Sequence, residues 1–90
     1  MEKSIYTDEY SLFLRELRQV REEKGLTQTD IAVRLGQTQS FISKVERGER
    51  RLDVVELRAY CDALEIPFPV FVRKLDAKIL DAREKRRSKK

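Results

Sequence analysis

Hydrophobic residues recur at intervals of three and four along most of this 90-residue chain, which is the spacing of amphipathic helices. No stretch alternates hydrophobic and polar residues for long enough to indicate a strand. The glycines and prolines separate the helical runs, at Gly25, Gly36, Gly48, Pro67 and Pro69. The pattern therefore predicts an all-α domain of five helices.

The first three predicted helices have recognisable ends. The first runs from about residue 8 to residue 24, with Thr7 as its N-cap. Two short helices follow, one after Thr27 and one after Thr38, because threonine is a favoured N-cap. Gly36 ends the earlier of these two, since glycine readily takes the left-handed conformation found after helices.

The second half of the chain predicts two more helices. Asp53 and Glu56 form a capping-box pair at the start of the fourth helix. The fifth helix starts near Pro67 or Pro69, because proline fits a first helical turn, and it ends after Asp81.

Charge is concentrated at the C-terminal end of the chain. The net charge is +4 and the pI is about 9.4. Residues 83–90 hold six basic side chains and one acidic one, a net of +5, so residues 1–82 sum to −1. We therefore expect one domain over residues 1–82 and a basic, disordered tail over residues 83–90. A nearly neutral domain gives no support for nucleic-acid binding from bulk charge, so local residues have to supply it.

The composition argues against several classes of function. The chain has no histidine and one cysteine, which speaks against a zinc site, an internal disulfide and Ser-His or Cys-His catalysis. We expect no metal, no cofactor and no enzymatic activity. The lack of a long apolar run or a secretory signal predicts a cytoplasmic protein with no membrane segment.

The stretch between Gly25 and Gly48 is the most informative part of the sequence. Its two short predicted helices are separated only by Gly36 and Gln37. Ala32, in the middle of the first of them, lets a crossing helix approach closely. This is the geometry of a helix-turn-helix, whose second helix enters the major groove of DNA.

The outward face of that second helix carries the candidate base contacts. With Ile42 and Val45 turned to the core, the residues left outside or at the margins are Gln39, Ser40, Phe41, Ser43, Lys44 and Arg47. Glutamine can pair with adenine, and lysine can reach the acceptors of guanine. Phe41 either belongs to the core or, as we favour, touches a thymine methyl group or a sugar.

Phosphate contacts are expected around the same helix. Gln28 and Gln37 lie at or beside helix N-termini, where backbone N–H groups favour an anion. Arg47, Arg50 and Arg51 lie just past the helix and can add contacts to phosphate. Residues 36–52 hold four basic and two acidic side chains, so the local field favours DNA.

The same stretch resembles a known family. Linked motifs run through Gly-Leu-Thr-Gln at 25–28, Ile-Ala at 31–32, Leu-Gly at 35–36 and Gln-Ser-x-Ile-Ser-Lys-Val-Glu-Arg-Gly at 39–48. They resemble the Cro/Xre-type helix-turn-helix proteins, which include phage repressors and many small bacterial regulators. The resemblance covers about residues 14–64. It implies a compact, five-helix, lambda-repressor-like fold and a sequence-specific DNA-binding transcriptional regulator.

The resemblance also implies roles for individual residues. It implies base reading by Gln39, Ser40 and Lys44, and contacts to the DNA backbone by Gln28, Thr38 and Ser43. Arg21 and Glu46 match a pair that forms a buried, structural ion pair in family members. Glu65 stands where the family commonly has glycine, so a different turn is expected after the fourth helix.

The fifth predicted helix carries more hydrophobic residues than one small core needs. The surplus predicts a two-fold homodimer contact through Phe68, Phe71, Val72, Leu75 and Ile79. Such a dimer would place two recognition helices about 34 Å apart on a pseudo-palindromic operator, as a repressor requires. The alternative is a protein-binding module, such as the antitoxin of a toxin–antitoxin pair, whose fifth helix and tail would bind a partner enzyme.

Overall fold

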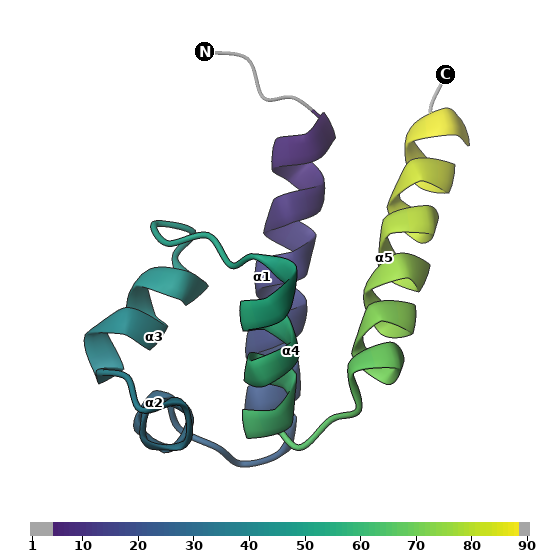
Figure 1. Ribbon diagram of the computed structural model, residues 1–90. Coiled ribbons are helices and arrows are strands. Elements are labelled where there is room, and N and C mark those ends of the chain that lie inside the picture. Colours follow the sequence, from purple (N-terminus) through teal and green to yellow (C-terminus); the bar gives the residue numbers. More distant parts are fainter. Residues whose placement is uncertain (1–4, 89–90) are drawn as a thin grey trace.

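The computed structural model describes residues 5–88, and this range folds into five helices without a strand, as predicted. The helices are α1 (Ile5–Glu23), α2 (Gln28–Leu35), α3 (Gln39–Glu46), α4 (Val54–Ala63) and α5 (Phe68–Ser88). α1 and α5 are long and lie next to each other, and α4 stands in front of the lower part of α1 in the view of Figure 1. The short helices α2 and α3 form the opposite side of the molecule from α5 (Figure 1).

All five helices contribute to one hydrophobic core. Each supplies at least one fully buried side chain, and these include Leu17, Ile31, Ile42, Cys61 and Phe71. Cys61 is thus a packing residue. Because α2 and α3 share this core with α1 and α4, the α2–α3 pair is held as a fixed unit.

The ends of α2 and α3 follow from residues next to them in the sequence. Thr27 caps α2 by accepting a hydrogen bond from the backbone N–H of Asp30, and Thr38 caps α3 in the same way. Gly36 has φ of 66°, in the left-handed region, where a side chain would be strained. These predicted ends are confirmed, and they set the angle between α2 and α3.

Both long helices are longer than predicted. α1 begins at Ile5 and runs through Thr7, so Thr7 is not an N-cap. α5 continues to Ser88, so the prediction that irregular structure starts at residue 83 is wrong for residues 83–88. Residues 89 and 90 of the expected tail lie outside the described residues. The extension of α5 is supported by Arg83 and Arg86, which pair with Glu9 of α1 at 2.6 and 3.7 Å.

The turn after α4 keeps the form that glycine would give it. Glu65 has φ of 62°, a left-handed conformation that is unfavourable for a residue with a side chain. The Lys24 ammonium donates to the Glu65 carbonyl at 2.6 Å. Arg34 donates to the carbonyl of Ala63 at 2.6 Å and pairs with the Glu65 carboxylate at 3.0 Å. The expectation of a different turn is therefore wrong, because two side chains hold Glu65 in this conformation.

The hydrophobic residues of α5 divide between core and surface. Phe71 is fully buried and meets Phe13 of α1 edge-on, so its prediction as a dimer contact is wrong. Phe68 and Leu75 pack partly against the core, whereas Val72 is 40% exposed. Ile79 is half-buried outside the core cluster. None of the helices described between residues 5 and 88 has the length and hydrophobicity to cross a membrane.

Candidate nucleic-acid interface

Helix α3 presents a polar face to solvent and an apolar face to the core. Ile42 and Val45 are completely buried, as the periodicity predicted. The side chains of Gln39, Ser40 and Lys44 are exposed. Three of the four predicted base-contacting residues therefore lie together on the outside of α3. An amide, a hydroxyl and an ammonium are groups that can bind base edges.

A buried ion pair anchors the inner end of this face. The Arg21 guanidinium donates two hydrogen bonds to the Glu46 carboxylate, at 2.6 and 3.1 Å, and a third to the Leu26 carbonyl at 2.9 Å. Both charged side chains are at most 10% exposed. Hydrogen bonding to Glu46 raises the pKa of Arg21. The pair implied by the family resemblance is thus present, and it ties α1 to α3.

The ion pair continues to the surface through two glutamines. The Gln28 side-chain amide donates to the Glu46 carboxylate at 2.9 Å, and the Gln39 amide donates to the Gln28 side-chain oxygen at 2.5 Å. Gln39 keeps its side-chain oxygen and a second N–H available for DNA. The link was not predicted, although Gln28 and Gln39 each open a helix. The pattern within each helix does not show that the first turn of α2 meets the first turn of α3.

The three arginines predicted to bind phosphate have different surroundings, and Arg51 lies over the Tyr10 ring, 4.1 Å from its centre. Arg47 donates to the Ser43 hydroxyl and pairs with the exposed Glu49 at 3.0 Å, which raises the pKa of Arg47. Arg50 pairs with Glu56 of α4 at 2.6 Å, and its guanidinium lies 5.2 Å from the centre of the Phe41 ring. Arg50 is therefore committed to contacts within the protein more fully than Arg47 is.

Phe41 does not point outward from α3, so the favoured prediction for it is wrong. Its ring is half-buried, packs against the core and lines a cavity beside Tyr60. The reason is helical geometry, because residue 41 lies four positions before the buried Val45 and shares part of its face. Phe41 therefore belongs to the support of α3.

The remaining predicted contacts lie at the first turn of α3. Gln37 and Thr38 are both exposed, and the Thr38 hydroxyl oxygen accepts from the backbone N–H of Phe41 at 3.1 Å. The Thr38 hydroxyl can still donate to an anion. Ser43 is half-buried one turn further along. The first turn of α3 thus places side-chain donors at the positive end of the helix dipole.

Comparison with known sequences agrees with this arrangement. A profile described as helix-turn-helix matches residues 17–71. The chain is 40% identical over 47 residues to an uncharacterized HTH-type transcriptional regulator, y4dJ, of Sinorhizobium fredii. The match covers 52% of this chain and 61% of that protein, so the chain spans less than two thirds of the relative's length.

Two solved structures are similar over most of the chain. An XRE-family like protein from Pseudomonas syringae pv. tomato is 39% identical, with a TM-score of 0.77, over 82% of this chain and 90% of that one. The restriction-modification controller protein C.Esp1396I, solved as a tetramer in complex with its natural 35-base-pair operator, is 30% identical. Its TM-score is 0.74, over 88% of this chain and 99% of that one. The predicted fold class is confirmed by these similarities.

Proposed function

Because the chain belongs to the Xre-type helix-turn-helix family, we propose that it is a sequence-specific DNA-binding transcriptional regulator that acts as a repressor. The main support for this proposal is the exposed polar face of α3. Gln39, Ser40 and Lys44 are exposed together, above two side chains that are completely buried. Such a helix can enter the major groove without disturbing the core.

In the proposed complex, bases and phosphates are bound by different residues. Gln39 pairs with an adenine, Lys44 binds guanine acceptors, and Ser40 contacts a neighbouring base. The phosphate contacts come from Gln28, Gln37, Thr38, Ser43 and Arg47, which lie on or beside the first turns of α2 and α3 or at the end of α3. Arg50 contributes less, because it is held both by Glu56 and over the Phe41 ring, whereas Arg47 pairs only with the more exposed Glu49.

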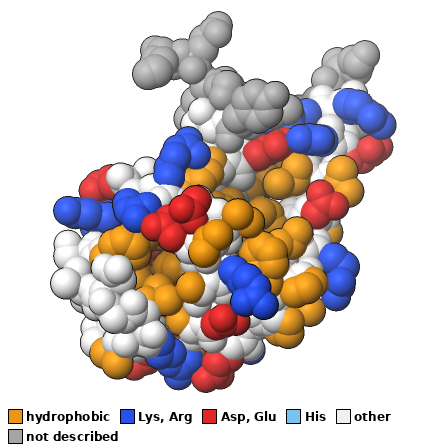
Figure 2. Space-filling view, in the orientation of Figure 1, with side chains coloured by type: hydrophobic (Ala, Val, Ile, Leu, Met, Phe, Trp, Pro, Cys, Tyr) orange, Lys and Arg blue, Asp and Glu red, His pale blue; other side chains and the backbone are white. Residues whose placement is uncertain are grey.

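We further propose that the regulator binds as a homodimer through α5. Val72 and Ile79 are seven positions apart and so lie on one face of α5, where neither is buried. Hydrophobic side chains also gather on the surface formed by α4 and α5 (Figure 2). Phe68 and Leu75 are half-buried and can complete a contact of this kind. The dimer would present two copies of α3 to successive major grooves and exclude other proteins from the operator.

Selection of bound DNA from a random pool tests the proposal. The expected result is an enriched pseudo-palindrome whose half-sites are about one helical turn apart. Enrichment of single, unpaired half-sites would contradict the homodimer. Recovery of DNA without any sequence preference would contradict base reading by α3.

A further inference from the structure

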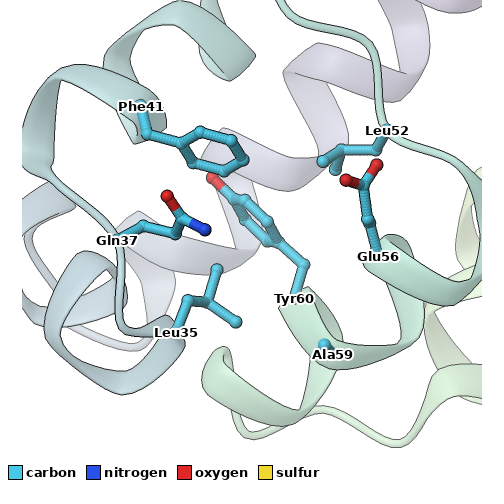
Figure 3. A pocket seen from close by; sticks show the side chains of 7 residues that line it. All are labelled: Leu35, Gln37, Phe41, Leu52, Glu56, Ala59 and Tyr60. Carbon is cyan, nitrogen blue, oxygen red and sulfur yellow. The ribbon is translucent and has the colours of Figure 1, made fainter.

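A cavity lies directly behind the first turn of α3. It has a volume of about 140 Å³ and lies between the end of α2, the start of α3 and the first half of α4. Leu35, Phe41 and Leu52 form its apolar walls (Figure 3). Its polar lining comes from Gln37 and Glu56, and Tyr60 completes the lining with its hydroxyl beside Phe41 and Gln37 (Figure 3). None of these residues was singled out from the sequence as a ligand contact for a small molecule.

The Tyr60 hydroxyl is the feature of this cavity that indicates a ligand. Tyr60 is 1% exposed, and its hydroxyl has no hydrogen-bond partner among the residues that the structure describes. It points toward the ring of Phe41 and the amide of Gln37 (Figure 3). Burial raises the pKa of Tyr60, so the group is a neutral donor. The hydroxyl oxygen is itself buried, so an acceptor in the cavity reaches it when the side chain of Phe41 or Gln37 shifts. Since a buried hydroxyl without a partner is unfavourable, that contact would stabilise the protein.

The charge around the cavity selects an uncharged occupant. The Glu56 carboxylate is the one charged group in the lining, and Arg50 pairs with it at 2.6 Å. Glu56 also accepts the backbone N–H of Asp53 at 2.9 Å. Hydrogen bonding to Arg50 lowers the pKa of Glu56, so the carboxylate stays ionised and paired. A cation would have to compete with Arg50, and an anion would be repelled by the carboxylate.

The size of the cavity and its walls complete the description of the ligand. An apolar protein cavity of about 150 Å³ holds one benzene ring. The rings of Phe41 and Tyr60 offer edges and faces for a further aromatic ring. We propose that this cavity is a binding site for an uncharged, single-ring aromatic molecule that carries a hydrogen-bond acceptor for the Tyr60 hydroxyl.

Occupation of this site would act on the DNA-binding surface, a consequence that rests on the proposed function. Gln37 and Phe41 line the cavity and stand on either side of the N-cap Thr38. A ligand that touches both residues changes the position of the first turn of α3, where Gln39 lies. Ligand binding and DNA binding are then coupled, and each changes the affinity for the other by the same factor.

Titration of the 90-residue protein with benzamide, followed by two-dimensional NMR, tests the site itself. Benzamide has one ring, no charge and a carbonyl acceptor, and benzoate is its charged counterpart. The expected result is a saturable shift of signals from the cavity lining, with a dissociation constant on the order of a millimolar. Benzoate should bind at least about tenfold more weakly. Unsaturable shifts, shifts mapped elsewhere, or equal binding of benzoate would overturn the proposal.

Two variants and one matched control sharpen this titration. Ala59→Leu fills the cavity from its exposed rim on α4 and should abolish binding. Ala77→Leu is the same change on the exposed surface of α5 and should leave binding unchanged. Tyr60→Phe keeps the shape of the cavity and should weaken benzamide about fivefold by removing the donor. Binding to Ala59→Leu as strong as to the unaltered protein would overturn the location.

The DNA arm uses the operator obtained by selection. Saturating benzamide should change the operator affinity of the unaltered protein and of Ala77→Leu, but not that of Ala59→Leu. An unchanged operator affinity, with benzamide shown by NMR to be bound, would overturn the coupling alone. Failure to bind any DNA without benzamide would overturn the proposed function and leave the NMR test of the cavity intact.

Discussion

The α2–α3 pair and the α1–α5 pair are held together in different ways. In the first, each helix end is fixed by a residue within a few positions, such as Thr27, Gly36 or Thr38. In the second, the contacts join distant parts of the chain. Lys78 donates to Gln19 across 59 positions, and Arg83 donates to Glu9 across 74. Local signals therefore set the ends of α2 and α3, while long-range polar contacts hold α5 against α1.

The two pairs also use their polar groups differently. On α5, Lys78 pairs at 2.5 Å with Glu16, a carboxylate that is only 2% exposed, and Arg83 is taken by Glu9. On α3, Ser40 and Lys44 are exposed on the outer face. The end of α5 also lies on the far side of the molecule from α3 (Figure 1). The comparison indicates that basic residues of α5 tie the helix to α1, whereas α3 keeps its polar groups for a ligand.

The largest expected difference between the two pairs is in stability. Glu46→Ala leaves Arg21 buried without its partner and should lower the free energy of unfolding by about 3–5 kcal/mol. Glu9→Ala leaves Arg83, which is half-exposed and can be solvated by water, and should cost far less. Urea unfolding of the two variants measures both values. Equal losses would contradict the distinction between a buried anchor and a surface tie.

The next effect concerns phosphate binding. Arg47→Gln should weaken binding to every DNA sequence and reduce the slope of log affinity against log salt by about one unit. Arg73→Gln, on the exposed surface of α5, is the matched control and should leave the slope unchanged. Fluorescence anisotropy at several salt concentrations gives both slopes. If Arg73→Gln reduced the slope and Arg47→Gln left it unchanged, phosphate would be bound by α5 and not by the end of α3.

A smaller effect comes from the two left-handed turns. Gly36→Ala should cost about 1 kcal/mol, because alanine is strained at φ of 66° even though no atom lies within 4 Å of the added carbon. Glu65→Gly relieves the same strain at φ of 62° and should stabilise by about 0.5 kcal/mol after the loss of the Arg34 pair. Thermal unfolding distinguishes the signs. Destabilisation by both changes would show that Arg34 matters more than backbone strain.

The smallest expected effect is a shift in one titration. Hydrogen bonding to Arg83 lowers the pKa of Glu9 below its usual value of 4.5. A lowered carboxyl pKa favours the folded state above that value, and the contribution is lost as the pH falls through the pKa of the folded protein. Arg83→Gln should raise the pKa of Glu9, as measured by NMR of its carboxyl carbon. An unchanged pKa would contradict the contact between α1 and the end of α5.

The sequence predicted the ends of the helices better for the α2–α3 pair than for the α1–α5 pair, and particular residues show why. Thr27 and Thr38 act on backbone groups only three positions away, so their effect is visible in the sequence. The predicted end of α5 was wrong because Arg83 is held by Glu9, which is 74 positions away in the sequence. Glu16 lies among the buried positions of α1, but nothing nearby in the sequence identifies Lys78 as its partner.

The errors at phenylalanine have a related cause. Periodicity identified hydrophobic stripes on α3 and α5, but it could not say where each stripe ends. Phe41 is on the margin of its hydrophobic stripe, and its ring packs against the core and lines the cavity beside Tyr60. Phe71 is in the centre of its stripe, where it meets Phe13 of α1. Tertiary packing decides which neighbouring helix covers each hydrophobic stripe. The periodicity of a single sequence does not identify that helix.

Competition between the selected operator and scrambled DNA shows whether Gln39 reads a base. Gln39→Ala should weaken operator binding by about 1–3 kcal/mol and leave binding to scrambled DNA nearly unchanged. Gln19→Ala, an exposed glutamine of α1, is the control and should affect neither. An equal loss on both DNAs from Gln39→Ala would show that Gln39 does not read a base.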